Sequence, residues 1–119
     1  MRALVIPADQ DEPARVEELT GPASERMRAL QALVGGFFQA IGITVRGSAA
    51  TLWMDEEGKL KDPMAPLNRR AHRLAQSVLM RGDWVGGDAV VMGPPSSSGN
   101  ETDCPQAVID LAREWRWLP

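Results

Sequence analysis

The sequence predicts an α+β domain: a mostly antiparallel sheet of four to five strands, two helices on one face, and a C-terminal amphipathic helix as an appendage. Three observations support this prediction. Short apolar or alternating runs bounded by turn residues are typical of strands. Longer stretches repeat apolar residues at helical spacing. Strands and helices do not alternate one by one, which favours α+β over a parallel α/β sheet.

Five short runs have the pattern of strands. An apolar run opens the chain, and an alternating run follows that is expected to pair antiparallel with it. Two further runs joined by a turn at Gly47-Ser48 predict a hairpin, and a last apolar run follows Gly86-Gly87. The expected strands are 2–6, 14–19, 37–45, 50–54 and 88–92.

Three stretches have the periodicity of helices. Ser24 is expected to cap the first helix, which ends at Gly35-Gly36 because glycine adopts the left-handed conformation at no steric cost. Asn68 is expected to cap a second helix of about a dozen residues, and Asp103 or Cys104 a third. The expected apolar faces are Met27, Leu30, Leu33 and Val34; Leu67, Ala71, Leu74, Val78 and Ala75 or Leu79; and Val108, Leu111, Ala112, Trp115 and Leu118.

Composition divides the chain into three parts. Residues 1–93 form the predicted α+β domain, and residues 94–103 are typical of a flexible linker because they contain few apolar side chains. Residues 104–118 form the C-terminal helix, whose apolar stripe must dock on another surface. Trp115 fits this stripe, whereas Trp117 falls off it and is the candidate for exposure. The two tryptophans either pack on the domain or contact a partner or a second copy of the chain.

Composition also excludes several classes of protein. The net charge of −3 provides no basic field for nucleic acid or an anionic membrane. A single cysteine and a single histidine exclude an intrachain disulfide and a Cys/His zinc site, while a carboxylate-only Mg²⁺ or Ca²⁺ site remains open. The apolar run near Met1 is too short for a signal peptide or a membrane span. We therefore expect a cytoplasmic protein with no cofactor.

The sharpest candidate site is a group of basic residues at the start of the second expected helix. Helical spacing places Arg69, Arg70 and Arg73 on one edge, and guanidinium groups bind carboxylates and phosphates through paired N–H donors. In the alternative, Asn68 is only a cap and the arginines pair with nearby acidic residues, namely Asp55, Glu56, Glu57 or Asp62. The candidate binding residues are Asp55, Lys59, Asn68, Arg69, Arg70 and Arg73.

The remaining residues that could take part in catalysis or ligand binding are better explained by roles in the fold or at the surface. Asp55, Glu56 and Glu57 precede a glycine and are typical of a solvated turn. His72 is interpreted as a surface residue, and Cys104 as incidental, because neither has a companion nucleophile or base nearby in sequence. Gly86-Gly87 leads into a strand rather than a helix, which disfavours a phosphate-binding loop. We therefore expect a protein that is not an enzyme.

Four segments together resemble a known family. They are ALQALVGGFF (29–38), LWMDEEGKLK (52–61), LNRRA (67–71) and VGGDAVVMG (85–93). In this order and spacing, the chain resembles the family catalogued as domain of unknown function 3846, found mainly in bacteriophages, plasmids and integrated elements. The resemblance covers residues 1–93 and implies a source rather than an activity.

These observations lead to two functional hypotheses. The first is a non-enzymatic accessory protein of a bacteriophage or mobile element, acting in the host bacterial cytoplasm. It would bind a host protein or a small anionic ligand through the arginine edge, with counter-defence or host takeover as roles that fit such a source. The alternative is a nucleic-acid contact through Arg69, Arg70, Arg73 and Arg81, against which the negative net charge argues.

Overall fold

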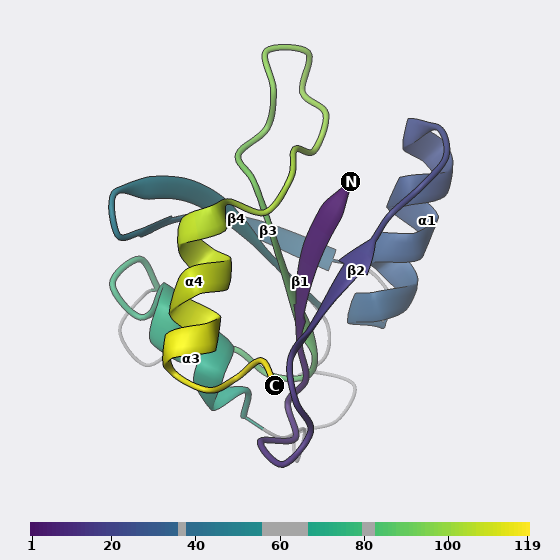
Figure 1. Cartoon of the computed structure of the whole chain (residues 1–119). Helices are drawn as coiled ribbons and strands as arrows, with labels where there is room; N and C mark the ends of the chain where they lie inside the picture. The colour runs from purple at the N-terminus through teal and green to yellow at the C-terminus, as the bar shows by residue number, and fades with distance from the viewer. Residues whose placement is uncertain (36–37, 56–66, 80–82) are drawn as a thin grey trace.

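The computed structural model describes residues 1–35, 38–55, 67–79 and 83–119. It contains an antiparallel sheet with helices on both faces, which confirms the predicted α+β class (Figure 1). The elements are β1 (Arg2–Ile6), β2 (Arg15–Glu18), α1 (Ala23–Val34), β3 (Phe38–Val45), β4 (Ser48–Asp55), α3 (Arg69–Ala75), β5 (Ala89–Met92) and α4 (Gln106–Glu114).

The five strands lie in the order β2-β1-β5-β4-β3, and each neighbouring pair is antiparallel. β5 comes last in sequence but occupies the centre of the sheet. All of its residues are 0% exposed, and Val91 lies opposite Leu4 on one side and Leu52 on the other. A strand that is covered on both faces carries a continuous apolar run rather than an alternating one, as Ala89–Met92 does.

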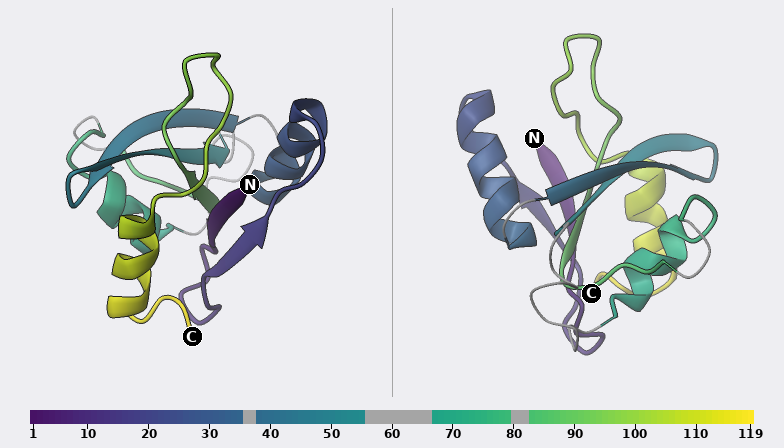
Figure 2. Two further views of the ribbon diagram at one scale, coloured as in Figure 1. Left: turned by 45° about the horizontal axis from the view of Figure 1, so that its top comes forward. Right: turned by 180° about the vertical axis from the view of Figure 1, so that it is seen from behind.

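Alternate side chains of the sheet belong to two apolar layers, and helices lie over both faces of the sheet (Figure 2). α1 covers the layer that contains Val5 and Val90, and α3 and α4 cover the opposite layer, which contains Leu4 and Val91. Two helices do share a face, but they are α3 and α4. The predicted C-terminal amphipathic helix is present, but it is part of the domain rather than an appendage, because its apolar side chains are buried in the same core layer as those of α3.

The β3–β4 hairpin turns at Arg46 and Gly47, one residue earlier than the predicted Gly47-Ser48. Both residues have positive φ, 49° and 83°, and Val45 pairs with Ser48. A two-residue turn with two positive φ angles is type I′, whose twist matches that of the flanking strands. Glycine adopts this conformation freely, whereas the side chain of Arg46 makes it unfavourable.

α1 begins and ends within a residue or two of its predicted bounds. Pro22 occupies the N-cap position, so Ser24 lies inside the first turn and is not the cap that we predicted. Gly35 ends the helix with φ 93°, and its N–H donates to the carbonyl of Gln31 at 2.9 Å. This end confirms the predicted glycine stop.

α4 begins at Gln106, with Pro105 rather than Asp103 or Cys104 at the N-cap position. Asp103 is engaged elsewhere, because its carboxylate accepts from the Arg2 N–H at 2.7 Å. The Cys104 N–H in turn donates to the Arg2 carbonyl at 2.8 Å. These two bonds fix the entry of α4 against the start of β1.

The stretch that we predicted as a flexible linker forms a loop that returns on itself between β5 and α4 (Figure 1). The Gly93 N–H donates to the Thr102 carbonyl at 2.9 Å, and the Ser96 N–H donates to the Asn100 carbonyl at 2.8 Å. The Thr102 hydroxyl donates to the Pro94 carbonyl at 2.6 Å. Local hydrogen bonds therefore close this loop although it contains few apolar side chains.

α3 is shorter than predicted. It ends at Ala75 after seven residues, so Val78 lies beyond the helix and is 52% exposed instead of buried. Leu67 precedes the helix and is 39% exposed. Residues 56–58 of the predicted acidic turn and Lys59 lie outside the described residues.

Candidate functional site

Asn68 connects the start of α3 to two distant parts of the chain. Its side-chain oxygen accepts from the Ala71 N–H at 3.0 Å and caps the helix, as predicted. Its amide nitrogen donates to the carbonyls of Ile6 at 2.8 Å and Gly87 at 3.0 Å. Asn68 is 0% exposed. All of its polar groups are satisfied inside the protein, so it has a structural role.

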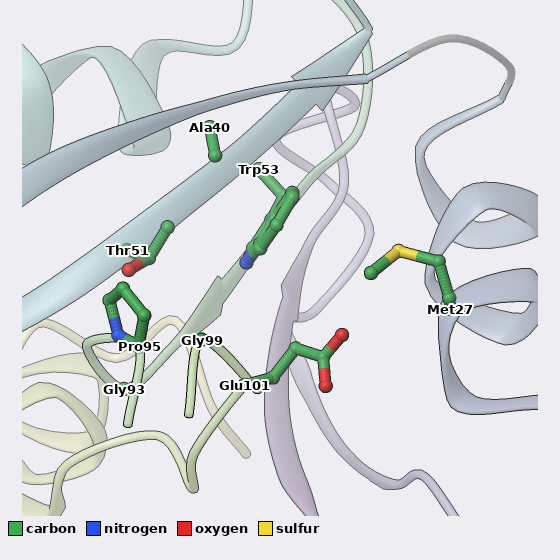
Figure 3. A pocket seen from close by; sticks show the side chains of 8 residues that line it. All are labelled: Met27, Ala40, Thr51, Trp53, Gly93, Pro95, Gly99 and Glu101. Carbon is green, nitrogen blue, oxygen red and sulfur yellow. The ribbon is translucent and has the colours of Figure 1, made fainter. Parts of the chain in front are cut away.

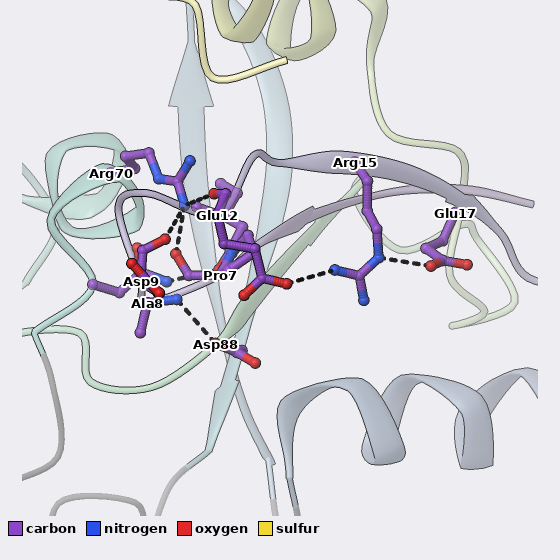
Figure 4. Close-up of polar contacts among 10 residues, drawn as sticks. Pro7, Ala8, Asp9, Glu12, Arg15, Glu17, Arg70 and Asp88 are labelled. Atoms are coloured by element: carbon purple, nitrogen blue, oxygen red, sulfur yellow. Dashed lines mark hydrogen bonds and ion pairs between the residues drawn. The ribbon is translucent and has the colours of Figure 1, made fainter. Parts of the chain in front are cut away.

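Arg70 reaches the connection between β1 and β2 (Figure 4). Its Nη2 donates to the carbonyls of Pro7, Asp9 and Glu12 at 2.8, 3.0 and 2.9 Å. Burial lowers the pKa of Arg70 from its ordinary value, and the charges of Asp9 and Glu12 partly oppose this effect. The alternative interpretation paired the arginines with acidic residues nearby in sequence, but Arg70 binds backbone carbonyls of a loop that is remote in sequence.

Arg73 points instead toward the C-terminal end of α4. The central carbon of its guanidinium lies 3.9 Å from the centroid of the Trp115 ring. Trp115 in turn makes an edge-to-face contact with Trp117, with ring centroids 5.3 Å apart and an interplanar angle of 71°. A guanidinium this close to an aromatic face makes a cation–π contact, which holds the Arg73 side chain against Trp115.

Trp117 was the candidate for exposure, but it is the more buried of the two tryptophans. Trp117 is 8% exposed and belongs to the core, whereas Trp115 is only partly buried. The helix ends at Glu114, and Arg116 then adopts a positive φ of 59°. Helical spacing therefore no longer applies to Trp117, whose N–H donates to Ala112 at 2.8 Å and whose carbonyl accepts from Ala14 at 2.9 Å.

A groove of about 330 Å³ opens beside Arg73, between the β3–β4 hairpin, α3 and α4. We call it the Arg73 groove. Its base includes apolar side chains of Val45, Leu74 and Leu111, and its rim carries two guanidinium groups. The lining residues are Thr44, Val45, Arg46, Arg73, Leu74, Gln76, Ser77, Leu111 and Trp115.

The two arginines of the Arg73 groove differ in their charge partners. Arg46 pairs with Glu114 of α4 at 2.6 Å, between side chains that are 43% and 61% exposed. Within the described ranges, Arg73 has no carboxylate at ion-pair distance. Arg73 therefore presents an exposed positive charge at the edge of an apolar base.

The predicted arginine edge is therefore split among three environments. Arg70 lies against the β1–β2 connection, Arg73 lies on Trp115, and Arg69 is exposed on α3. Asp55 is half-buried at the end of β4, and Lys59 is outside the described part of the chain. Sequence reasoning missed the contribution of Arg46, although an arginine in a tight turn beside glycine is an unusual choice.

His72 and Cys104 are less accessible than surface residues. His72 is half-buried, and its Nδ1 is a buried atom without a hydrogen-bond partner among the described residues. Burial raises the pKa of the Cys104 thiol to about 12, so this thiol stays protonated at neutral pH and is a poor nucleophile.

Within residues 1–35, 38–55, 67–79 and 83–119, no group of three or more His, Cys, Asp and Glu side chains is placed to hold a metal ion. None of the described helices has the length and apolar character needed to cross a membrane.

The sequence matches one family model, described as Domain of unknown function (DUF3846), over residues 1–116. This match confirms the resemblance and extends it from residue 93 through α4. The extension agrees with the packing of α4 in the same apolar layer as α3. No curated protein and no solved structure matches the chain.

Proposed function

We propose that this chain, which belongs to the family described as Domain of unknown function (DUF3846), is not an enzyme. We propose that it binds a small anionic ligand in the Arg73 groove. The source that we propose is a bacteriophage or mobile element acting in a bacterial cytoplasm. This source follows from the resemblance alone, and the proposed binding follows from the geometry of the groove.

The stacking of Arg73 on Trp115, at 3.9 Å, is the observation that supports the proposal most directly. A guanidinium held by an aromatic face keeps its N–H donors free in one plane, where they match the two oxygens of a carboxylate or phosphate. Holding the side chain before binding also lowers the entropy lost on binding. The apolar base formed by Val45, Leu74 and Leu111 provides a surface for the body of the ligand.

Arg46 supplies a second positive charge on the same rim. It occupies a left-handed position that disfavours residues with a side chain, and unfavourable backbone conformations occur preferentially at functional sites. Its partner Glu114 is 61% exposed, so an incoming anion can replace this carboxylate at little energetic cost. We propose that Arg46 provides the second contact to the anion.

Nucleic-acid binding is the weaker candidate. Arg70 is one of the arginines that this alternative requires, and it is held by three backbone carbonyls. The net charge of −3 also opposes association with a polyanion.

Calorimetric titrations with inorganic phosphate, citrate and adenosine monophosphate test the proposal. Arg73→Gln should weaken binding of the strongest of these ligands by about tenfold or more, since a hydrogen bond to a charged group contributes about 1.5–3 kcal/mol. Arg69→Gln is the matched control, because it removes the same charge from an exposed position on the same helix. We expect it to change the affinity by less than about twofold, given that charge–charge interactions at the surface are screened.

Equal effects of the two substitutions, or no binding of any probe, would count against a small-ligand site. In the second case, affinity capture from a bacterial lysate separates two outcomes. A partner retained by the wild type and lost in Arg73→Gln indicates that the anionic group belongs to a host protein. A partner retained by both variants excludes the groove as the site.

A further inference from the structure

A second cavity, of about 160 Å³, lies on the opposite face of the sheet, beside α1 (Figure 3). We call it the Trp53 cavity. β4 contributes Thr51 and Trp53, α1 contributes Met27, and the loop after β5 contributes Gly99 and Glu101. It shares no lining residue with the Arg73 groove.

Two residues that line this cavity each carry a buried polar atom that has no hydrogen-bond partner in the described structure. These atoms are Nε1 of Trp53, which is a donor, and Oε2 of Glu101, which is an acceptor. Figure 3 shows the indole nitrogen of Trp53 turned toward the side of the cavity that Gly99 and Glu101 bound. Buried polar atoms are usually satisfied, so an unsatisfied pair in one cavity indicates a missing donor and a missing acceptor.

The carboxylate of Glu101 has a positively charged partner, but its Oε2 atom has no hydrogen bond. Its side chain is 7% exposed, and Oε2 lies 3.7 Å from Nη2 of Arg26. That distance is within reach of an ion pair but too long for a hydrogen bond. Because Arg26 neutralises the carboxylate, a ligand here need not carry a charge, but it must supply an N–H or O–H to Oε2.

The loop fixes Glu101 at the edge of the cavity. The residue after it, Thr102, is held by its hydroxyl bond to Pro94 at 2.6 Å and by its carbonyl bond to Gly93 at 2.9 Å. Trp53 is fixed from the other side, since its ring packs edge-to-face on Phe38 with centroids 5.0 Å apart. The loop backbone next to Glu101 and the ring of Trp53 are therefore both held in place before any ligand binds.

The walls of the cavity favour a small, flat molecule. The ring of Trp53 and the thioether of Met27 are polarizable surfaces that interact well with aromatic rings. The cavity is smaller than the roughly 300–1,000 Å³ of sites for drug-sized ligands. A molecule of one ring, or of two fused rings lying partly at the opening, is therefore of suitable size.

We propose that the Trp53 cavity binds a small, uncharged nitrogen heterocycle, of the kind found in nucleobases, which donates a hydrogen bond to Glu101 and accepts one from Trp53. This inference is independent of the function proposed for the Arg73 groove. Each unsatisfied atom then obtains the partner that it lacks, and the ring replaces water against the apolar walls.

Titration of the ¹⁵N-labelled protein, followed through its indole N–H resonances, tests this inference. The probes are 2-pyridone, which carries one donor and one acceptor, N-methyl-2-pyridone, which lacks the donor, and benzene, which lacks both. Trp53→Phe identifies the resonance of Trp53, because it removes one indole N–H and keeps an aromatic ring at this position.

We expect 2-pyridone to shift the Trp53 resonance saturably, and N-methyl-2-pyridone to bind at least about tenfold more weakly because it leaves the Glu101 carboxylate unsatisfied. Trp53→Phe should also weaken the binding of 2-pyridone about tenfold, measured by calorimetry. The matched variant Trp115→Phe, on the other face of the sheet, should leave this affinity unchanged. Benzene binding as tightly as 2-pyridone, or no probe shifting the Trp53 resonance, would overturn the inference.

Discussion

Asn68→Ala should lower the free energy of unfolding by about 3–5 kcal/mol. The lost helix cap contributes about 1 kcal/mol. The substitution also leaves the carbonyls of Ile6 and Gly87 without the donor that now lies at 2.8 and 3.0 Å, and each buried unsatisfied carbonyl costs about 1–3 kcal/mol. The lower part of the summed range applies because the Gly87 contact is only partly buried.

Asn68→Asp distinguishes the effect of the helix cap from that of the two hydrogen bonds to Ile6 and Gly87. The aspartate keeps an oxygen for the Ala71 N–H, but it replaces the amide donor with an acceptor that faces two carbonyls. We therefore expect Asn68→Asp to be at least as destabilising as Asn68→Ala in urea unfolding followed by tryptophan fluorescence and circular dichroism. An Asn68→Asp variant close to wild type, together with a loss of only about 1 kcal/mol in Asn68→Ala, would refute the reasoning, because capping alone would then explain the residue.

Three further predictions concern stability. Arg70→Gln should lower the free energy of unfolding in urea by about 1–2 kcal/mol, because three backbone carbonyls lose a charged donor. Arg69→Gln should stay within about 0.5 kcal/mol of wild type. Equal losses in the two variants would contradict the structural role of Arg70. Arg46→Asn should keep or raise stability by up to about 1 kcal/mol, because Asn-Gly suits a type I′ turn; a clear loss would show that the pair with Glu114 matters more. The pKa of Cys104 rises from 9.0 to about 12 on folding, so its contribution to stability is complete below pH 9 and is lost as the pH rises toward 12. The free energy of unfolding should thus fall more steeply with pH over that range in wild type than in Cys104→Ala, and parallel pH profiles would contradict the burial of the thiol.

Local sequence patterns predicted the local features of this fold. The strand runs, the antiparallel β1–β2 pair, the glycine stop of α1 and the cap at Asn68 each depend on neighbouring residues. The central place of β5 was not predicted, because strand pairing depends on contacts between distant parts of the chain. The continuous apolar run Ala89–Met92 was the available signal, since it indicates burial on both faces.

The same distinction applies to the candidate sites. Sequence placed Arg70 and Arg73 on one helix edge, but the partner of each comes from a segment remote in sequence. Helical spacing was applied beyond Glu114, where α4 ends, and the expected exposure of Trp117 was therefore wrong. The Trp53 cavity was not predicted, because the loop that borders it contains few apolar residues and was interpreted as a linker. In the structure this loop is closed by the hydrogen bond from Thr102 to Pro94, and Glu101 beside Thr102 carries a buried carboxylate oxygen.

The central claim is that Arg73 binds a ligand while Arg70, three residues away, stabilises the fold. The most direct test is the dissociation constant of Arg73→Gln relative to Arg70→Gln, for the strongest of the three anions, at a temperature where both variants are folded. We expect a ratio of about ten or more, since of these two residues only Arg73 lines the groove. A ratio near one, or weaker binding by Arg70→Gln, would contradict the assignment of these two roles.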